Sequence, residues 1–155
     1  MFHKIMVAYD ESPEANKALE SAIELTKALE AELSIVTVVE PLPAYFSWAV
    51  SALPAVHWSE YQRRKSALLQ ASARQRAEAA GLWTDTELVN GDEVDSIIKC
   101  AQKHRADLLI LGMRQHTLLM GHTAKDVAER SPCTLMGVPL DNTYRHASHH
   151  PTSAP

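Results

Sequence analysis

The sequence contains only two cysteines, Cys100 and Cys133, among 155 residues. Two cysteines are too few for a disulfide framework, and their spacing matches no zinc-binding or redox motif. Cys100 borders an apolar helical face and Cys133 begins an apolar run, so both are interpreted as small packing residues rather than reactive thiols. This cysteine usage indicates a protein of the reducing cytoplasm.

An excess of positive charge is also absent. Lysine and arginine total 15 against 19 acidic residues, which gives a net charge of -4 and a pI near 6.0. A protein that binds nucleic acid needs a basic surface to neutralise the phosphates. We therefore expect no nucleic-acid partner.

No apolar run is long enough to cross a membrane. The segment Pro41–Trp58 carries no Asp, Glu, Lys or Arg. Pro41, Pro43 and Pro54 interrupt it, and it is shorter than the roughly 20 residues that a spanning helix needs. The N-terminus MFHKIMVAYD is typical of a strand and lacks the features of a signal peptide. We expect neither a membrane span nor a membrane partner.

Common catalytic motifs are missing too. No G-x-S-x-G, H-E-x-x-H or G-x-x-x-x-G-K-[ST] pattern occurs. ATP hydrolysis would need a positioned base and a metal ligand, and Asp10 is the single weak candidate. The sequence therefore predicts no catalytic residues, and slow nucleotide hydrolysis ranks last among the functions considered.

The chain does have the composition of a globular domain. Hydrophobic residues make up 46% and charged residues 22%, a balance that allows a chain of this length to bury a core. Residues 1–140 are predicted to form one domain. Residues 141–155, DNTYRHASHHPTSAP, are polar and rich in Pro, Ser and His, and are predicted to be a disordered tail.

Apolar runs alternate with helical patterns along the chain. Five apolar or β-branched runs predict strands, at Lys4–Tyr9, Leu33–Val39, Trp83–Val89, Leu108–Leu111 and Cys133–Val138. Helical spacing between them predicts four helices, at about Pro13–Glu30, Ser59–Ala80, Val94–His104 and Thr123–Arg130. Ser12-Pro13 is typical of a helix start and Gly81 of a helix end. This alternation predicts an α/β fold, with a parallel open sheet and helices on both faces.

The stretch Asp107–Val127 is the main candidate site. Its short strand is followed by Gly112, a polar loop, a turn at Gly121–Thr123 and a helix start. Unpaired backbone N–H groups and the helix dipole favour an anion such as phosphate at such a place. Ligands of open parallel sheets bind beyond the carboxyl ends of the strands, where the strand order reverses. If the first and fourth strands are neighbours, Asp10 faces this loop and would accept hydrogen bonds from a ribose or base.

Four segments, in this order, resemble the universal stress protein family over residues 3–139: KIMVAYDES, IVTVVEP, LVNGD, and ADLLILGMR with MGHTAKDVAERSPCTLMGVP. The resemblance is to the small single-domain bacterial type, whose Rossmann-like fold is that of the adenine-nucleotide alpha-hydrolases. It implies the strand order 3-2-1-4-5, with the reversal between strands one and four. It also implies a role in stress response and a homodimer, often formed through the last strand, here Cys133–Val138.

Members of this family that bind ATP or AMP carry the pattern G-x2-G-x9-G-[ST] after strand four. The resemblance implies that the glycines and the hydroxyl wrap the phosphates, that the acidic residue after strand one holds the adenosine, and that strand two lies against the adenine. Magnesium would accompany only ATP. The corresponding nucleotide-binding positions of this chain are Ala8, Tyr9, Asp10, Val38, Gly112, Met113, Arg114, Gly121, His122 and Thr123.

The chain departs from that pattern at two points of the loop. Gln115 stands where the second glycine belongs, and only eight residues separate Gly112 from Gly121, fewer than in the pattern. A side chain at a tight phosphate turn resists positive φ and blocks close backbone approach. Gln at this point also resembles the branch of the family that binds no nucleotide.

Other residues of the loop favour an anion. His122 takes the hydroxyl position, but Thr123 stands next to it and can serve instead. Arg114, His116, His122 and Lys125 place several potential cations around the loop. AMP or a smaller anion is therefore as plausible a ligand as ATP.

Each candidate also has a structural interpretation. Asp10 is a common helix-cap or turn residue, and Gly112 and Gly121 can be ordinary loop glycines. No metal cofactor is predicted. Three of the eight histidines would chelate a metal only weakly, because they lie in the tail: His146, His149 and His150.

The segment Pro41–Trp58 is the most unusual local feature. Its aromatic residues make it too apolar to lie free in water, and it follows the second strand on the ligand side of the sheet. It is interpreted as packing within the dimer or over the site, with a protein partner as the alternative. Two functions follow for the whole chain: a nucleotide-binding stress protein, or a dimeric interaction module of the same fold that binds no nucleotide.

Overall fold

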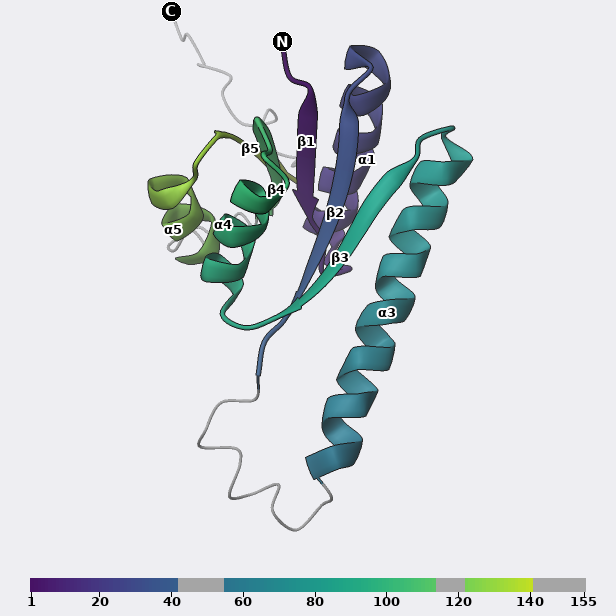
Figure 1. Cartoon of the computed structure of the whole chain (residues 1–155), viewed down its shortest axis with the longest axis vertical. Helices are drawn as coiled ribbons and strands as arrows, with labels where there is room; N and C mark the ends of the chain where they lie inside the picture. Colours follow the sequence, from purple (N-terminus) through teal and green to yellow (C-terminus); the bar gives the residue numbers. More distant parts are fainter. Residues whose placement is uncertain (42–54, 114–121, 141–155) are drawn as a thin grey trace, which may run out of the picture.

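The computed structural model describes residues 1–41, 55–113 and 122–140, and its elements follow the predicted order (Figure 1). The strands and helices are β1 (Lys4–Ala8), α1 (Pro13–Leu29), β2 (Glu32–Val39), α3 (Ala55–Ala79), β3 (Thr84–Asn90), α4 (Glu93–Lys103), β4 (Leu108–Met113), α5 (His122–Arg130) and β5 (Thr134–Pro139). Two bounds differ from the prediction by more than one residue. Helix α3 starts four residues earlier, at Ala55, and β4 continues through Gly112 to Met113.

The five strands form one parallel sheet in the order β3-β2-β1-β4-β5, as predicted. Strand β1 is central: Val7 pairs with Ile35 of β2 on one side and with Ile110 of β4 on the other. From β1 the chain adds β2 and then β3 toward one edge of the sheet, and afterwards adds β4 and β5 toward the other edge. The strand order therefore reverses between β1 and β4. This reversal opens a crevice at the carboxyl edge of the sheet.

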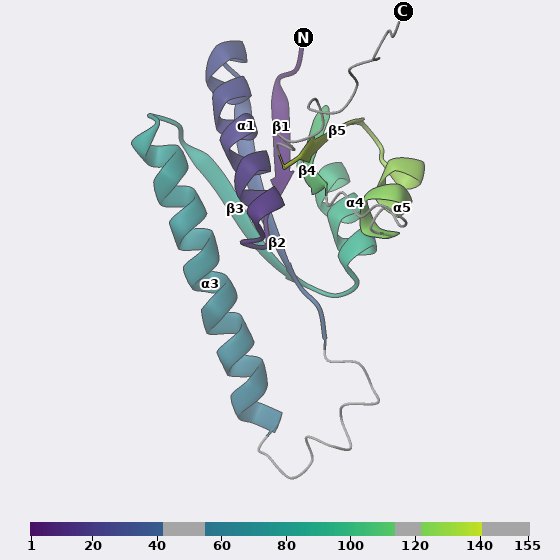
Figure 2. The ribbon, with the colours of Figure 1, turned by 180° about the vertical axis from the view of Figure 1, so that it is seen from behind.

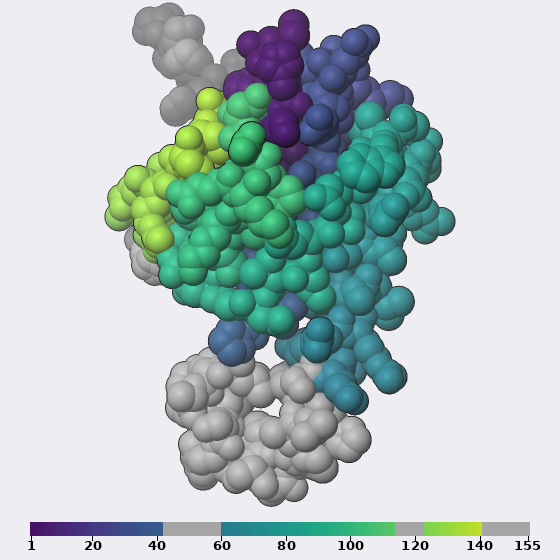
Figure 3. Space-filling model, viewed as in Figure 1, coloured from purple at the N-terminus to yellow at the C-terminus, as the bar shows by residue number. Residues whose placement is uncertain are grey.

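Helices cover both faces of the sheet. Helices α1 and α3 lie on one face, and α4 and α5 on the other (Figures 1 and 2). Side chains of the central strand alternate between the two layers, because successive residues of a strand point to opposite faces. Ile5 and Val7 pack with Leu19 of α1, whereas Met6 packs with Ile97 of α4. In the space-filling view, α4 and α5 cover the left part of the near face (Figure 3).

The start of α1 agrees with its sequence. Ser12 is the N-cap, and its Oγ accepts a hydrogen bond from Ala15 N at 3.1 Å, with Pro13 in the first turn. Helix α3 ends before Gly81, whose φ of +82° suits a residue without Cβ. The N-terminus of α1 follows the carboxyl end of β1 after a short turn and so lies beside the crevice.

Asp107, the first residue of the candidate stretch, has a structural role. Its two carboxylate oxygens accept hydrogen bonds from His3 N at 2.8 Å and Lys4 N at 3.0 Å, which ties the start of β4 to the start of β1. Burial raises the pKa of Asp107, but these backbone hydrogen bonds outweigh it, and the pKa lies below its usual value. Asp107 is therefore at the far end of β4 from the crevice.

Both cysteines are free thiols. Cys100 is buried in α4, and Cys133 lies just before β5 beside Ser131. Burial is the largest influence on both groups and raises the pKa of each thiol above its ordinary value. A raised pKa disfavours the reactive thiolate, in agreement with their interpretation as packing residues.

No helix in the three described ranges is long and apolar enough to cross a membrane. The predictions for the Pro41–Trp58 segment fall largely on residues outside the described ranges, and those for the tail, residues 141–155, fall wholly outside them.

Candidate functional site

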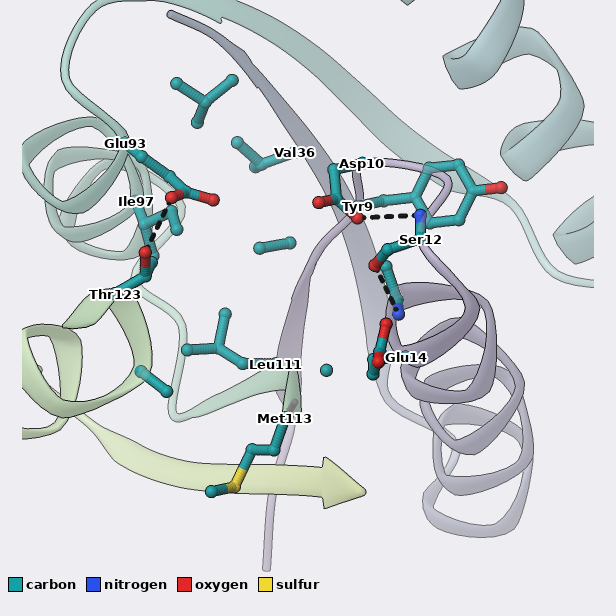
Figure 4. Close-up of a pocket in the computed structure, with 15 residues that line it drawn as sticks. Tyr9, Asp10, Ser12, Glu14, Val36, Glu93, Ile97, Leu111, Met113 and Thr123 are labelled. Carbon is teal, nitrogen blue, oxygen red and sulfur yellow. Dashed lines mark hydrogen bonds between the residues drawn. The ribbon is translucent and has the colours of Figure 1, made fainter. Parts of the chain in front are cut away.

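A cavity of about 260 Å³ lies at the carboxyl edge of the sheet, where β1 and β4 separate (Figure 4). Its position is the one that the strand order predicts for a ligand site. Its volume is close to the lower end, roughly 300 Å³, of typical small-molecule pockets. The lining residues are Ala8, Tyr9, Asp10, Ser12, Glu14, Ala15, Val36, Val38, Glu93, Ile97, Leu111, Gly112, Met113, Thr123 and Ala124.

Asp10 enters the cavity from the turn after β1. Its Oδ1 accepts a hydrogen bond from Ser12 N at 3.0 Å, which closes the turn into α1. The structural interpretation of Asp10 as a turn residue is therefore correct, while the cap of α1 is Ser12. The two roles are compatible. The Asp10 side chain is exposed and lines the cavity, so its carboxylate is available to a ligand as well.

Tyr9 turns its side chain away from the cavity. The residue is 4% exposed, and its hydroxyl donates to Asn16 Oδ1 at 3.1 Å on the α1 side of the sheet (Figure 4). Arg76 of α3 donates to the same oxygen at 2.7 Å. The Tyr9 backbone continues the sheet, with its N–H bonded to the Val36 carbonyl at 2.8 Å. Only the main chain of Tyr9 can therefore meet a ligand in the cavity.

Gly112 is a strand residue pressed against α1, and the prediction that it ends the strand and opens the loop is wrong. A Cβ at this position would lie 2.5 Å from the Glu14 carbonyl carbon and 2.6 Å from Ala15 N. Only glycine lets the N-terminus of α1 come this close to β4. The residue still lines the cavity, so it shapes the site through this backbone contact.

Apolar side chains from β2, β4 and α4 form another part of the cavity wall. Val36 and Val38 come from β2, Leu111 and Met113 from β4, and Ile97 from α4. Their side chains make this part of the cavity apolar, as is usual in sites that bind an apolar ring.

Met113 lies against β5 and covers the backbone of Gly137 (Figure 4). This contact holds the last residue of β4 in place at the edge of the cavity.

Glu93 and Thr123 meet on the side of the cavity opposite Asp10 (Figure 4). They come from the first turns of α4 and α5, and Thr123 Oγ1 donates a hydrogen bond to Glu93 Oε2 at 2.8 Å. Burial raises the pKa of Glu93; the Thr123 hydrogen bond opposes this shift, and the negative charges of Glu40, Asp10 and Asp92 add to it. The pKa of Glu93 is raised overall.

The described wall of the cavity is acidic. Its acidic residues are Asp10, Glu14 and Glu93, and its described residues include no Lys, Arg or His. In the described ranges, no cluster of three or more His, Cys, Asp or Glu residues is placed to hold a metal ion. The polar chemistry of this wall therefore suits hydrogen-bond donors, such as ribose hydroxyls or an amino group, better than a bare polyphosphate.

Most of the predicted site residues line this one cavity. They are Ala8, Tyr9, Asp10, Val38, Gly112, Met113 and Thr123. Arg114, Gln115, Gly121 and the side chain of His122 fall outside the described residues.

The prediction named Asp10 but missed the other two charged residues of the described wall, Glu14 and Glu93. A signal for Glu93 was present, because it follows the Asn90-Gly91-Asp92 turn after β3 and so lies at the carboxyl edge of the sheet.

Comparisons with known proteins agree with this fold. The model of the universal stress protein family matches residues 1–139. A universal stress protein from Thermus aquaticus is 29% identical over 144 residues, which cover 88% of this chain and 98% of that protein.

Solved structures extend the comparison. A universal stress protein in complex with cAMP is 25% identical, with a TM-score of 0.67 and coverage of 88% of this chain and 97% of that one. One from Archaeoglobus fulgidus in complex with dAMP has the same fold, with 16% identity, a TM-score of 0.66 and the same two coverages.

Proposed function

The chain belongs to the universal stress protein family, and on that premise we propose that it binds an adenine nucleotide in the cavity between β1 and β4. The observation that carries the proposal is the convergence of Asp10, Val38, Gly112 and Thr123 on a single cavity at the strand-order reversal. Two structures of similar fold hold cAMP and dAMP, which are also adenine nucleotides. Magnesium enters only if the ligand is ATP.

Each part of the cavity has a role in this proposal. Asp10 accepts hydrogen bonds from the adenosine, and Val36 and Val38 support the ring face of the adenine. The N-terminus of α5, with the Thr123 hydroxyl, lies where a phosphate would meet unpaired backbone N–H groups. The free thiols of Cys100 and Cys133 support a cytoplasmic location, where thiols stay reduced.

Binding is tested first on the unmodified protein. Native mass spectrometry is expected to show an added adenosine or AMP mass, and AMP is expected to raise the melting temperature, whereas GMP is not. A ligand at about 100 times its Kd stabilises the folded state by about 2.7 kcal/mol, a shift that differential scanning fluorimetry resolves. Absence of any bound mass, together with an unchanged melting temperature at millimolar adenosine, AMP and ATP with magnesium, would refute nucleotide binding.

We also propose that the protein is a homodimer formed through β5. Among the described strands this one is the edge of the sheet: its outer backbone groups pair with no described strand, and Met136 is 36% exposed. Unprotected edges of this kind pair readily with a second chain. The same surface would serve the alternative function, an interaction module that binds no nucleotide.

Light scattering after size-exclusion chromatography tests the dimer. The unmodified chain is expected to have twice the monomer mass, and Met136→Lys is expected to shift it toward the monomer, because a charged side chain disfavours pairing at an edge. Leu68→Lys is the matched control, since Leu68 is 72% exposed on α3 and far from β5. A monomer mass for the unmodified chain, or equal effects of the two substitutions, would contradict this interface.

A further inference from the structure

The contact between Glu93 and Thr123 occupies a group that a phosphate would need. Thr123 Oγ1 donates to Glu93 Oε2 at 2.8 Å, and both residues line the cavity. A hydroxyl has one hydrogen to donate. A ligand phosphate that takes this hydrogen must therefore displace the Glu93 carboxylate, or lie beside it.

The charge around this contact is unfavourable to phosphate. Glu93 is only partly exposed, and its carboxyl group points toward Asp10 across the cavity (Figure 4). Asp10 and Glu93 therefore place two carboxyl groups on this part of the described wall, and no Lys, Arg or His is among the described lining residues. Repulsion between like charges is stronger in a partly buried site than in water. The penalty grows with the number of phosphate charges.

We propose that Glu93 is a specificity-determining residue that limits the phosphate charge of the ligand, so that the cavity favours adenosine and AMP over ADP and ATP. The proposal rests on the proposed function and adds to it a ligand class and a residue that sets it. Adenosine has no phosphate and therefore does not compete with Glu93 for the hydrogen of the Thr123 hydroxyl. Each further phosphate adds negative charge at the end of the cavity that Glu93 occupies.

The fold does not need the Glu93 charge. Helix α4 is capped by Asp92, whose Oδ1 accepts from Asp95 N at 2.9 Å. Glu93→Gln keeps an oxygen that accepts from Thr123 and removes only the charge. Because the folded-state pKa of Glu93 is raised, its ionised form disfavours the folded state at neutral pH. The E93Q protein is therefore expected to melt at or above the temperature of the unmodified protein.

Binding of a charge series tests the proposal. Dissociation constants for adenosine, AMP, ADP and ATP are measured by calorimetry, with EDTA present to exclude metal bridges between phosphates and carboxylates. In E93Q, adenosine is expected to bind within about twofold of the unmodified protein. AMP is expected to bind about tenfold more tightly, and ATP to gain more than AMP.

The control variant is Glu24→Gln, which makes the same change of net charge. Glu24 is exposed on α1, does not line the cavity and lies about 15 Å along the helix from Glu14. It is expected to leave all four affinities unchanged. Equal gains for E24Q and E93Q would mean that net charge alone acts, and would overturn the role of Glu93.

The remaining outcomes separate this proposal from the proposed function. If adenosine and AMP bind the unmodified protein but E93Q leaves the series unchanged, or weakens AMP, the specificity role is wrong and nucleotide binding stands. If neither protein binds adenosine or any of the nucleotides, both proposals fail.

A pH series gives a readout that a purely structural residue would not move. As the pH falls through the raised pKa of Glu93, its charge is lost, and AMP affinity of the unmodified protein is expected to approach that of E93Q. The acidic groups around Glu93 are Asp10, Glu40 and Asp92. They are the same in both proteins, as is the phosphate, so the ratio of the two affinities isolates Glu93. A ratio that stays flat with pH would contradict the proposal.

Discussion

Replacing Gly112 by alanine is expected to lower the free energy of unfolding by about 3 kcal/mol or more, at the upper end of overpacking costs. The added Cβ would lie 2.5 Å from the Glu14 carbonyl carbon, 2.6 Å from Ala15 N and 2.7 Å from the Glu14 carbonyl oxygen. These are backbone atoms of α1, so relief requires the whole helix start to move. Urea denaturation monitored by circular dichroism measures the loss.

Gly137→Ala is the matched control for this experiment. The nearest atom to a Cβ at Gly137 is the sulfur of Met113, the flexible end of a long side chain. Met113 can change rotamer, so the cost at Gly137 is expected to be clearly smaller than at Gly112. Substitutions away from such close contacts usually change the free energy of unfolding by no more than about 0.5 kcal/mol. A change this small in G112A would contradict the close contact between Gly112 and α1.

The Gly112 result also bears on the site. The α1 start carries the turn that holds Asp10, because Ser12 N bonds to Asp10 Oδ1 at 3.0 Å. A shift of α1 away from β4 would therefore move Asp10 as well. We expect G112A to weaken adenosine binding even at temperatures where the protein remains folded.

Replacing Asp10 by alanine is expected to weaken adenosine binding by about tenfold or more, and AMP binding by less, because the Asp10 charge also repels the phosphate. A hydrogen bond to a charged group contributes about 1.5–3 kcal/mol, and tenfold in affinity corresponds to about 1.4 kcal/mol. Adenosine affinity separates the two proposed roles, because D10A is expected to lower it whereas E93Q is expected to leave it nearly unchanged. Calorimetry with both ligands measures it.

Asp10→Asn separates the ligand contact from the turn. Asparagine keeps an oxygen that accepts from Ser12 N and removes only the charge, so its affinity is expected to lie between those of D10A and the unmodified protein. The folded state should tolerate both changes, since Asp10 is exposed and its described hydrogen bond contributes about 1 kcal/mol. Unchanged adenosine affinity in D10A would show that the family role does not apply at this position.

The spacing of apolar residues was enough to locate the strands and helices of this chain, because that spacing is a property of residues that are close together in the sequence. Ser12-Pro13 begins α1 as predicted, and the apolar run after Asp107 forms β4. The strand order did not come from periodicity. It followed from the resemblance to the family, and the sheet has that order. Once the order is known, the carboxyl ends of β1 and β4 bring Asp10 and Gly112 to one cavity.

The reason for Gly112 was not visible in the sequence. A glycine after an apolar run has the same local pattern whether it opens a loop or admits a helix, and the loop interpretation was the more common one. What decides between them is the distance from β4 to α1, which is set by how the helix packs on the sheet. That packing involves residues about a hundred positions away in the chain, Glu14 and Ala15.

The sequence by itself determined the α/β class, the family and the position of an acidic residue after the first strand, because short-range patterns and matching segments carry this information. Only the tertiary structure decided the character of the site. The contact of Glu93 with Thr123 joins residues 30 positions apart, and it exists because α4 and α5 start side by side at the same edge of the sheet. No local pattern encodes the distance between two helix starts, since that distance depends on the register and packing of the whole sheet.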